Sequence, residues 1–264
     1  MVPGRLAVEH MAITVSFFDD TSLPEFRDYR GIKHDVFVRE QGWQLPLEPD
    51  AQIVAPDPSD RHSMFVIARA GGRAIGIARA TMISDAFPHA DLFAGQMERP
   101  ELQAVRAAVA TVNSVAVRPA FRGKAVRVDD RARTMTAGKA LMVELARRLD
   151  AAGAEVVLLT TSPGIAAVFF DHVGYYLIDP PFHALDRNLI NMGLCVHDTE
   201  HFSDIGSPLS DLEYAEGASE AERRCIAYFR ERHAMILQGK RMEEFCRDAL
   251  ARDPSPAGTY AAAK

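Results

Sequence analysis

Cysteine is scarce in this chain of 264 residues, which contains three. Cys195, Cys225 and Cys246 are too few and too scattered for a disulfide scaffold or a zinc motif. The sequence has no run of about eighteen apolar residues, so no membrane span is predicted. The N-terminus lacks the basic start, apolar stretch and cleavage site of a signal peptide. These absences predict a cytoplasmic protein with reduced thiols.

Positive charge is also in deficit, because 30 lysines and arginines stand against 36 aspartates and glutamates, for a formal net charge of −6. Nucleic acid is therefore not expected as the main partner, since phosphate binding favours a basic face. Hydrophobic residues make up 48% of the chain, enough for one substantial core or for one domain with an appendage. Both a monomer and a homodimer fit this composition.

The most informative stretch runs from Thr111 to Ala152. An apolar run through Val112, Val115 and Val117 predicts a strand, which leads into a basic loop that contains glycine. An amphipathic helix with leucines four residues apart follows, with Glu144, Arg147 and Arg148 expected to face away from the leucines and Gly153 expected at the helix end. The free amides and the positive dipole end at the start of a helix form a ready site for phosphate. The stretch therefore predicts a strand, an anion-binding loop and a helix N-terminus in succession.

Three segments, VAVRPAFRGKA, GKALMVELARRLDAAGAEVVLLT and AAVFFDHVGYY, resemble the acetyl-coenzyme A binding core of the GNAT superfamily of N-acyltransferases. The resemblance implies an α/β (α+β) fold with a mixed central sheet flanked by helices, and it implies acyl-CoA as a co-substrate. In that family the strand backbone binds the pantetheine arm and an R-G-x-G/A loop binds the pyrophosphate. The matching residues are Val115, Ala116, Val117, Arg118, Arg122, Gly123, Lys124 and Ala125.

The segment 126–137 (VRVDDRARTMTA) is an insert between this loop and the helix. One interpretation keeps the pyrophosphate at residues 122–125 and makes the insert a surface flap. The other moves the pyrophosphate to the true helix start, at Thr136, Ala137, Gly138 and Lys139. We favour a shared site, because the helix supplies amides and the arginines supply charge. The insert itself is expected to be a solvated charged loop, with a dock for an acidic carrier protein or a 3′-phosphate as the alternative.

A second resemblance covers the segment HDVFVREQGWQLPLEPDAQIVAPDPSD. Phe37 followed by Trp43, then Asp57 and Asp60, is similar to the N-terminal half of acyl-homoserine-lactone (autoinducer) synthases, which share the GNAT fold and often use acyl carrier protein. Arg79 corresponds to an arginine of their G-x-x-R-L pattern. The resemblance implies that Trp43 and Arg79 bind substrate. Three carboxylates are the candidates to bind or deprotonate an amine: Glu40, Asp57 and Asp60.

Two expected catalytic positions depart from these patterns. This chain has Thr111 where the E-x-S-R pattern of autoinducer synthases has its glutamate, and Ser114 where that pattern has its arginine. Ser114 is kept as a substrate-binding candidate. The tyrosine that serves as general acid in many GNAT proteins corresponds to Phe170, which cannot donate a proton. Nearby substitutes are Tyr175, Tyr176 and His172, of which we select Tyr175, although packing is the commoner role for each.

No metal site is predicted. His197 and His201 are four residues apart, with Glu200 between them, and this spacing on a helix could ligate a metal. They follow a strand in a polar segment, which does not favour such a site. Cys195 has no evident base beside it and is expected to be inert.

The remaining pattern predicts strands at 13–18, 155–161, 176–178 and 189–196, and a hairpin around Gly71-Gly72. Helices are predicted from Pro24 to near Gly42, irregularly over 88–109, and over 165–172. A polar loop is expected at DPPFHALDRN. The last prediction is one C-terminal helix over 220–251 with Met235 on its apolar face.

The sequence thus predicts an acyltransferase domain over 1–200, a linker over 201–217, a helical extension over 218–252 and a disordered tail over 253–264. The leading hypothesis is transfer of an acyl group from acyl-CoA or acyl carrier protein to the amine of a small molecule, such as an amino acid or a specialised metabolite. One alternative is an autoinducer-synthase-like enzyme that uses acyl carrier protein. The other is a module that binds acyl-CoA without turnover.

Overall fold

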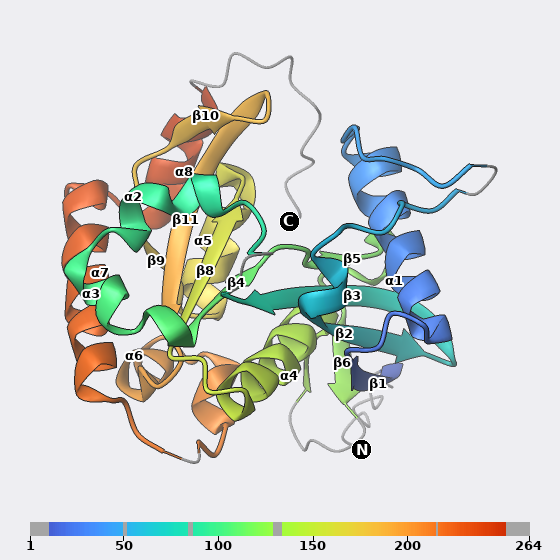
Figure 1. Cartoon of the computed structure of the whole chain (residues 1–264), viewed down its shortest axis with the longest axis horizontal. Coiled ribbons are helices and arrows are strands. Elements are labelled where there is room, and N and C mark those ends of the chain that lie inside the picture. The colour runs from blue at the N-terminus through green and yellow to red at the C-terminus, as the bar shows by residue number, and fades with distance from the viewer. Residues whose placement is uncertain (1–10, 50–51, 84–86, 129–133, 215, 252–264) are drawn as a thin grey trace, which may run out of the picture.

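The computed structural model describes residues 11–49, 52–83, 87–128, 134–214 and 216–251. Within these residues, one mixed sheet has the strand order β10-β11-β8-β4-β3-β2-β1-β6-β7, with β5 paired to β3 and β9 paired to β11 (Figure 1). The pairs β4–β8 and β1–β6 are parallel and the others are antiparallel. The strands are β1 Met11–Phe18, β2 Ser63–Ala70, β3 Arg73–Met82, β4 Val109–Val112, β5 Ala116–Val117, β6 Ala125–Val128, β7 Thr134–Thr136, β8 Val156–Thr161, β9 Tyr176–Leu177, β10 Phe182–Ala184 and β11 Arg187–Cys195.

The helices lie on both faces of this sheet. Short 3-10 turns occupy Asp60–His62, Ala90–Phe93, Arg106–Ala108, Pro119–Phe121 and Pro208–Asp211. The longer elements are α1 Pro24–Lys33, a π-helix at His34–Glu40, α2 Ala94–Met97, α3 Pro100–Ala104, α4 Ala137–Ala151, α5 Pro163–His172, α6 Thr199–Asp204, α7 Glu220–Leu237 and α8 Met242–Ala251. None of these described helices combines the length and the apolar composition that crossing a membrane requires.

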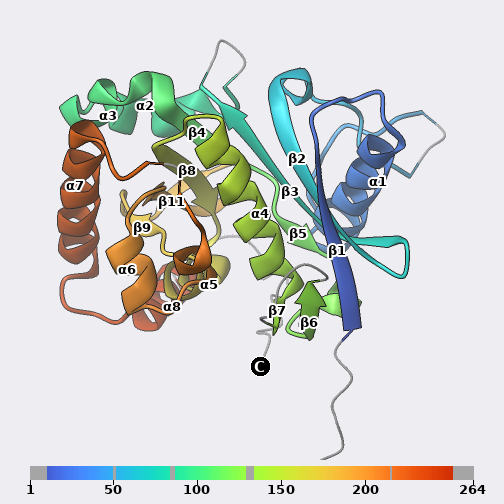
Figure 2. The ribbon, with the colours of Figure 1, turned by 90° about the horizontal axis from the view of Figure 1, so that it is seen from below.

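Alternation along the strands decides which face each helix covers. Ala80 of β3 and Val112 of β4 are paired and belong to the core under α4 and α5. Ile77 of β3 instead packs with α1, and Val109 of β4 shares a cluster with Phe229 of α7. Helices α4 and α5 therefore cover one face, while α1 and α7 cover the two ends of the other face (Figures 1 and 2).

Local sequence signals account for several element boundaries. Gly71 and Gly72 have φ values of 53° and 79°, as the tight turn between β2 and β3 requires. Gly153, at φ 79°, follows the last turn of α4, the position where a helix C′ glycine is favoured. The hairpin and this helix end are confirmed.

Other expectations were wrong in detail. The insert after Lys124 is not a simple loop, because β6 and β7 pair with each other and β6 extends the sheet beside β1. Its arginines and aspartates at 129–133 lie outside the described residues. The segment DPPFHALDRN contains β10, which forms a hairpin with β11. Glu144 does not face solvent; it is buried and accepts hydrogen bonds from Arg147 and Arg148.

The C-terminal part is built into the core. Its predicted single helix is divided into α7 and α8 by Gln238 and Gly239, which have φ values of 50° and 80°. Helix α7 packs on β9 and β11, and α8 packs on α5. Met235 is exposed, so its predicted place on the apolar face was wrong. The domain boundaries stay a prediction, although Phe202, within the predicted linker, is fully buried, and the predicted tail at 253–264 lies outside the described residues.

Candidate functional site

The sheet opens at the end of the central strand. Strand β4 runs parallel to β8 up to the pair Val112–Leu159. After three intervening residues, β5 continues along β3 through the pairs Gly76–Val117 and Ile77–Ala116. No described ladder joins β5 to β8, which instead continues along β11. The two neighbouring strands therefore separate, and the backbone of β5, with Val115 before it, presents an edge that β8 does not pair.

The N-terminus of α4 lies beside this edge. A Cβ atom added at Gly138 would be 3.9 Å from Val117 Cγ2, so the first turn of α4 abuts β5. The close approach depends on Gly76, where a Cβ would lie 3.0 Å from Leu141 Cδ1 and 3.2 Å from the Ala116 carbonyl oxygen. Thr136 Oγ1 accepts a long hydrogen bond of 3.4 Å from Lys139 N. Gly138 and Lys139 are half-exposed, so the helix start is capped weakly and is open to solvent.

The two loop arginines are held by acids from the π-helix. Arg122 forms a bidentate pair with Glu40, at 2.5 and 2.6 Å, and donates to the Val117 carbonyl oxygen at 2.7 Å. Arg118 forms an ion pair with Asp35. Among the described residues, neither Lys124 nor Lys139 pairs with a carboxylate. Gly123 has a φ of 67°, which places a turn between the paired arginines and Lys124.

A cavity of about 520 Å³ lies between this loop and the π-helix. Its basic members are Arg39, Arg73 and Arg118, and Phe121 contributes an apolar wall. Its complete lining is Asp35, Arg39, Glu40, Arg73, Arg118, Pro119, Ala120 and Phe121. This mixture of guanidinium groups and apolar surface lies directly beside the predicted phosphate loop.

Arg79 brings together the two predicted aspartates. Its buried guanidinium lies 3.0 Å from Asp60 Oδ1 and 3.6 Å from Asp57 Oδ1, and its Nε donates to Ser63 Oγ at 3.0 Å. Burial tends to raise the pKa of Asp57, but hydrogen bonds from Ser59 and the charge of Arg79 together lower it. The ionised form of Asp57 is thereby favoured, which makes it a weaker base than a free carboxylate.

A row of polar residues crosses the sheet face opposite α4. Thr81 of β3 pairs with Thr111 of β4, and Arg79 follows on the same face. On the far side of the strand break, Thr160 of β8 pairs with Asn191 of β11, and their side chains are hydrogen-bonded at 2.7 Å. The row lies between the apolar cluster under α1 and the one under α7. Ser114, which is buried, lies in the chain between β4 and β5.

Trp43 contacts Arg187, which is far from it in the sequence. Its ring lies 5.3 Å from Phe37 and carries the guanidinium of Arg187 at 4.3 Å from its centroid. Arg187 begins β11, directly after the turn of the β10–β11 hairpin. No sequence pattern indicates this contact, because 144 positions separate Trp43 from Arg187 and neither charge nor periodicity connects them.

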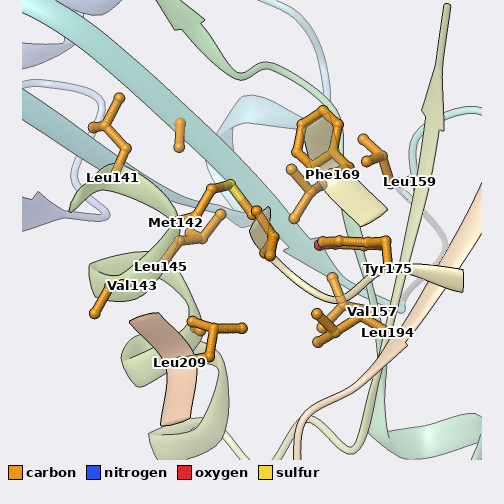
Figure 3. Close-up of a cluster of buried hydrophobic side chains, with 14 of the residues drawn as sticks. Leu141, Met142, Val143, Leu145, Val157, Leu159, Phe169, Tyr175, Leu194 and Leu209 are labelled. Atoms are coloured by element: carbon orange, nitrogen blue, oxygen red, sulfur yellow. The ribbon is translucent and has the colours of Figure 1, made fainter. Parts of the chain in front are cut away.

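The candidate acids on and after α5 lie in apolar or stacked surroundings. Tyr175 is buried in the core among Val157, Leu159 and Leu194 (Figure 3), and burial raises its pKa. Phe170 stacks on His233 of α7, with ring centroids 4.3 Å apart. The general-acid role of Tyr175 stays a prediction, and its apolar surroundings do not favour proton transfer.

The remaining titratable candidates serve to hold the fold. His197 Nε2 lies 2.9 Å from Asp150, and its Nδ1 lies 2.6 Å from Glu222. The hydrogen bond to Glu222, opposed by burial and aided by Asp150, raises the pKa of His197 to about 9. Burial raises the pKa of the Cys195 thiol. The described residues contain no group of three or more potential ligands arranged to hold a metal.

No protein-family model matches the sequence, and a search of the curated proteins finds no match either. Solved structures do match. BjaI, a CoA-dependent acyl-homoserine lactone synthase solved with SAM and isopentyl-CoA, gives a TM-score of 0.53 at 18% identity, covering 82% of this chain and 99% of that one. TofI, solved in a ternary complex with an inhibitor and MTA, gives 0.52 at 19% identity, covering 75% and 98%.

FeeM, an N-acyl amino acid synthase from uncultured soil microbes, gives a TM-score of 0.51 at 14% identity and covers 75% of this chain and 96% of that one. Such likeness at low identity establishes the fold. This chain has the fold of the acyl-homoserine lactone and N-acyl amino acid synthases, and the predicted mixed sheet flanked by helices is confirmed.

Proposed function

We propose that this protein is an N-acyltransferase that moves an acyl group from a thioester donor to the amine of a small molecule. The observation that carries the proposal is the separation of β5 from β8 directly beside the open N-terminus of α4. The unpaired backbone edge suits the amide groups of a pantetheine arm, and the helix start suits its phosphates. The solved structures of the same fold include BjaI with isopentyl-CoA.

The donor phosphates are assigned to the loop and the helix start. Lys124 and Lys139 have no carboxylate partner among the described residues, so they are free to meet an anion. Arg122 is paired with Glu40, and a phosphate would compete with that carboxylate for the same guanidinium. Coenzyme A and acyl carrier protein both present a phosphopantetheine arm, and the adjacent cavity has room for further groups of the donor.

The acceptor is assigned to the polar row on the opposite face. Arg79 there can bind a carboxylate, while Asp57 and Asp60 can bind a protonated amine. In the reaction the amine nitrogen forms a bond to the thioester carbon, the carbon–sulfur bond breaks, and the leaving thiolate takes up a proton. Positioning the two reactants supplies most of the acceleration in this scheme. Glu40, Asp57 and Asp60 stay as proposed proton acceptors.

Thiol release tests the proposal. The protein is mixed with acyl-CoAs of increasing chain length, or with the same acyl groups on acyl carrier protein, and with a panel of amines that includes amino acids. Free thiol is followed with a thiol-reactive dye, and the amide product is identified by mass spectrometry. Release that depends on the amine supports N-acyl transfer. The absence of both coenzyme A binding and thiol release with either donor class would refute it.

An autoinducer-synthase-like reaction is the second candidate. It is favoured by the ion pairs that join Arg79 to Asp57 and Asp60, three of the residues that carried the resemblance. Thr111 and Ser114, however, replace the glutamate and arginine of that pattern. The same assay with SAM as acceptor and acyl carrier protein as donor separates the two candidates. Binding of acyl-CoA without release of thiol would instead indicate a silent binding module.

A further inference from the structure

Asn113 is the first residue beyond the last pair between β4 and β8, at the point where the strands separate. Both polar atoms of its side chain are buried, and neither has a hydrogen-bond partner among the described residues. A buried carboxamide without partners is costly, and such groups are rare in folded proteins. The cost is explained if a ligand in the strand opening completes the hydrogen bonds.

Ser162 shows the same anomaly on the facing strand. It follows β8, three residues beyond Leu159, and it is the N-cap residue of α5. A serine at this position normally caps the helix with its hydroxyl. Here the hydroxyl makes no cap bond, is buried and has no partner within the described chain. Two unpartnered polar groups therefore flank the opening from its two sides.

The position of Asn113 places it between the proposed donor and acceptor sites. Its backbone N–H donates to the Arg79 carbonyl oxygen at 3.2 Å, so it continues the pairing of β4 with β3. Alternation assigns Asn113 to the face that carries Thr111 and Arg79. That is the face proposed for the amine, while β5 immediately downstream is proposed for the thioester arm.

We propose that the Asn113 carboxamide is a catalytic group of the acyl transfer, an inference that rests on the proposed function. Its N–H donates to the thioester carbonyl oxygen as that oxygen gains negative charge, and its oxygen accepts an N–H of the attacking amine. The amine lone pair forms the carbon–nitrogen bond, and the carbonyl electron pair moves to oxygen. When that pair returns, the carbon–sulfur bond breaks, the nitrogen gives its extra proton to one of the proposed acceptor carboxylates, and the thiolate takes up a proton in its place. Asn113 itself exchanges no proton, and Ser162 binds an amide of the arm.

Asn113→Leu tests the assignment, because leucine has nearly the same size and removes both polar ends. We expect kcat to fall roughly 100-fold, as is usual when a donor to a developing oxyanion is lost. The dissociation constant for coenzyme A should stay within about threefold. The melting temperature should be unchanged or higher, because no internal hydrogen bond is lost.

Asn191→Leu is the matched control. The Asn191 carboxamide lies on the same face but is fully engaged, donating to the Leu92 carbonyl oxygen and to Asp179 and accepting from Thr160. Its removal should lower the melting temperature clearly. A similar loss of stability in Asn113→Leu would show that Asn113 is structural and would overturn the inference, as would a kcat within threefold of the parent.

Asn113→Asp separates the donor from the acceptor function, because it keeps the shape and replaces the N–H donors by a second oxygen. It should lose at least as much kcat as the leucine variant. The parent protein decides the underlying function independently. If it releases no thiol from any donor, the proposed function fails. If it turns over and Asn113→Leu does so equally well, only the role of Asn113 fails.

Discussion

Gly193 of β11 is a position of close contact between the sheet and the C-terminal helix α7. A Cβ atom at Gly193 would lie 2.6 and 2.7 Å from two ring atoms of Phe229, and 3.2 Å from Ile178 Cγ2. The Phe229 ring is completely buried, so it cannot swing into solvent. Gly193→Ala therefore forces either the ring or the whole of α7 away from the sheet.

Overpacking of this kind costs about 1–3 kcal/mol, and the two contacts below 3 Å place Gly193→Ala at the upper end of that range. For a chain of this size the melting temperature should fall by roughly 4–10 °C. Urea unfolding should give the same loss with an unchanged slope. Gly95→Ala is the matched control, because no atom lies within 4 Å of the added Cβ and no positive φ is required; it should be neutral or slightly stabilising.

A double-mutant cycle with Phe229→Leu identifies the cause. The smaller side chain should lose about 1–2 kcal/mol by itself through the space that it leaves. In the double variant the added methyl group occupies part of that space, so the two losses should fall short of additivity by about 1 kcal/mol or more. Strict additivity, or a Gly193→Ala variant as stable as Gly95→Ala, would show that α7 does not pack on β11 as described.

Three further predictions concern charge. Glu40→Gln should lower KM for the donor by up to about fivefold if Arg122 binds phosphate, because an exposed pair is worth about 1 kcal/mol at most; a 100-fold or larger fall in kcat would instead identify Glu40 as a base. Asp60→Asn should lower the free energy of unfolding by up to about 3 kcal/mol, because it removes the nearer and more deeply buried of the two carboxylates that pair with the buried Arg79 charge, and addition of Arg79→Met should recover part of that loss in urea unfolding. Because the pKa of His197 is raised to about 9, its contribution to stability should be complete below about pH 6.5. It should be lost as the pH rises through 9, so urea unfolding of the parent and of His197→Gln should converge at high pH.

The parts of the fold that could be predicted are those set by near neighbours in the sequence. Gly71 and Gly72 indicate their hairpin because only a backbone with positive φ closes a two-residue turn. Gly153 ends α4 for a related reason. The stripe from Phe26 to Phe37 predicts a helix, and a helical backbone does continue to Glu40. The hydrophobic pattern does not indicate that the helix changes to π geometry at His34.

Errors arose where contacts in the folded chain decide the environment, whether the partners are near or far in the sequence. Glu144 was expected on the solvent side of α4 because it is charged and lies off the leucine stripe. It is buried nonetheless, since Arg147 and Arg148 satisfy its carboxylate. The division between α7 and α8 did have a local signal in Gly239, which could have predicted two helices.

The candidate site shows the same limit. The sequence selected Arg122 and Glu40 separately, one as a phosphate ligand and the other as an acid or base, but 82 positions separate them and nothing in the sequence pairs them. Their bidentate contact makes the two assignments interdependent. Asn113 was missed because an asparagine at a strand end usually indicates a turn. Asn113 is unusual because its buried side-chain atoms have no hydrogen-bond partner among the described residues, and only the three-dimensional structure shows this.

Phe170 shows how the C-terminal helices and the chemistry are connected. From sequence alone, its replacement of the family's tyrosine is a lost proton donor. In the structure the ring stacks on His233 of α7 and lies near His201. Burial, with the nearby His201, lowers the pKa of His233 to about 4, so the imidazole is neutral at physiological pH and can stack in an apolar contact. A tyrosine ring at position 170 would stack on the same neutral imidazole. Phe170 thus joins α5 to α7 through an apolar ring contact, and the proposed reaction needs its proton donor from another residue, for which Tyr175 stays the prediction.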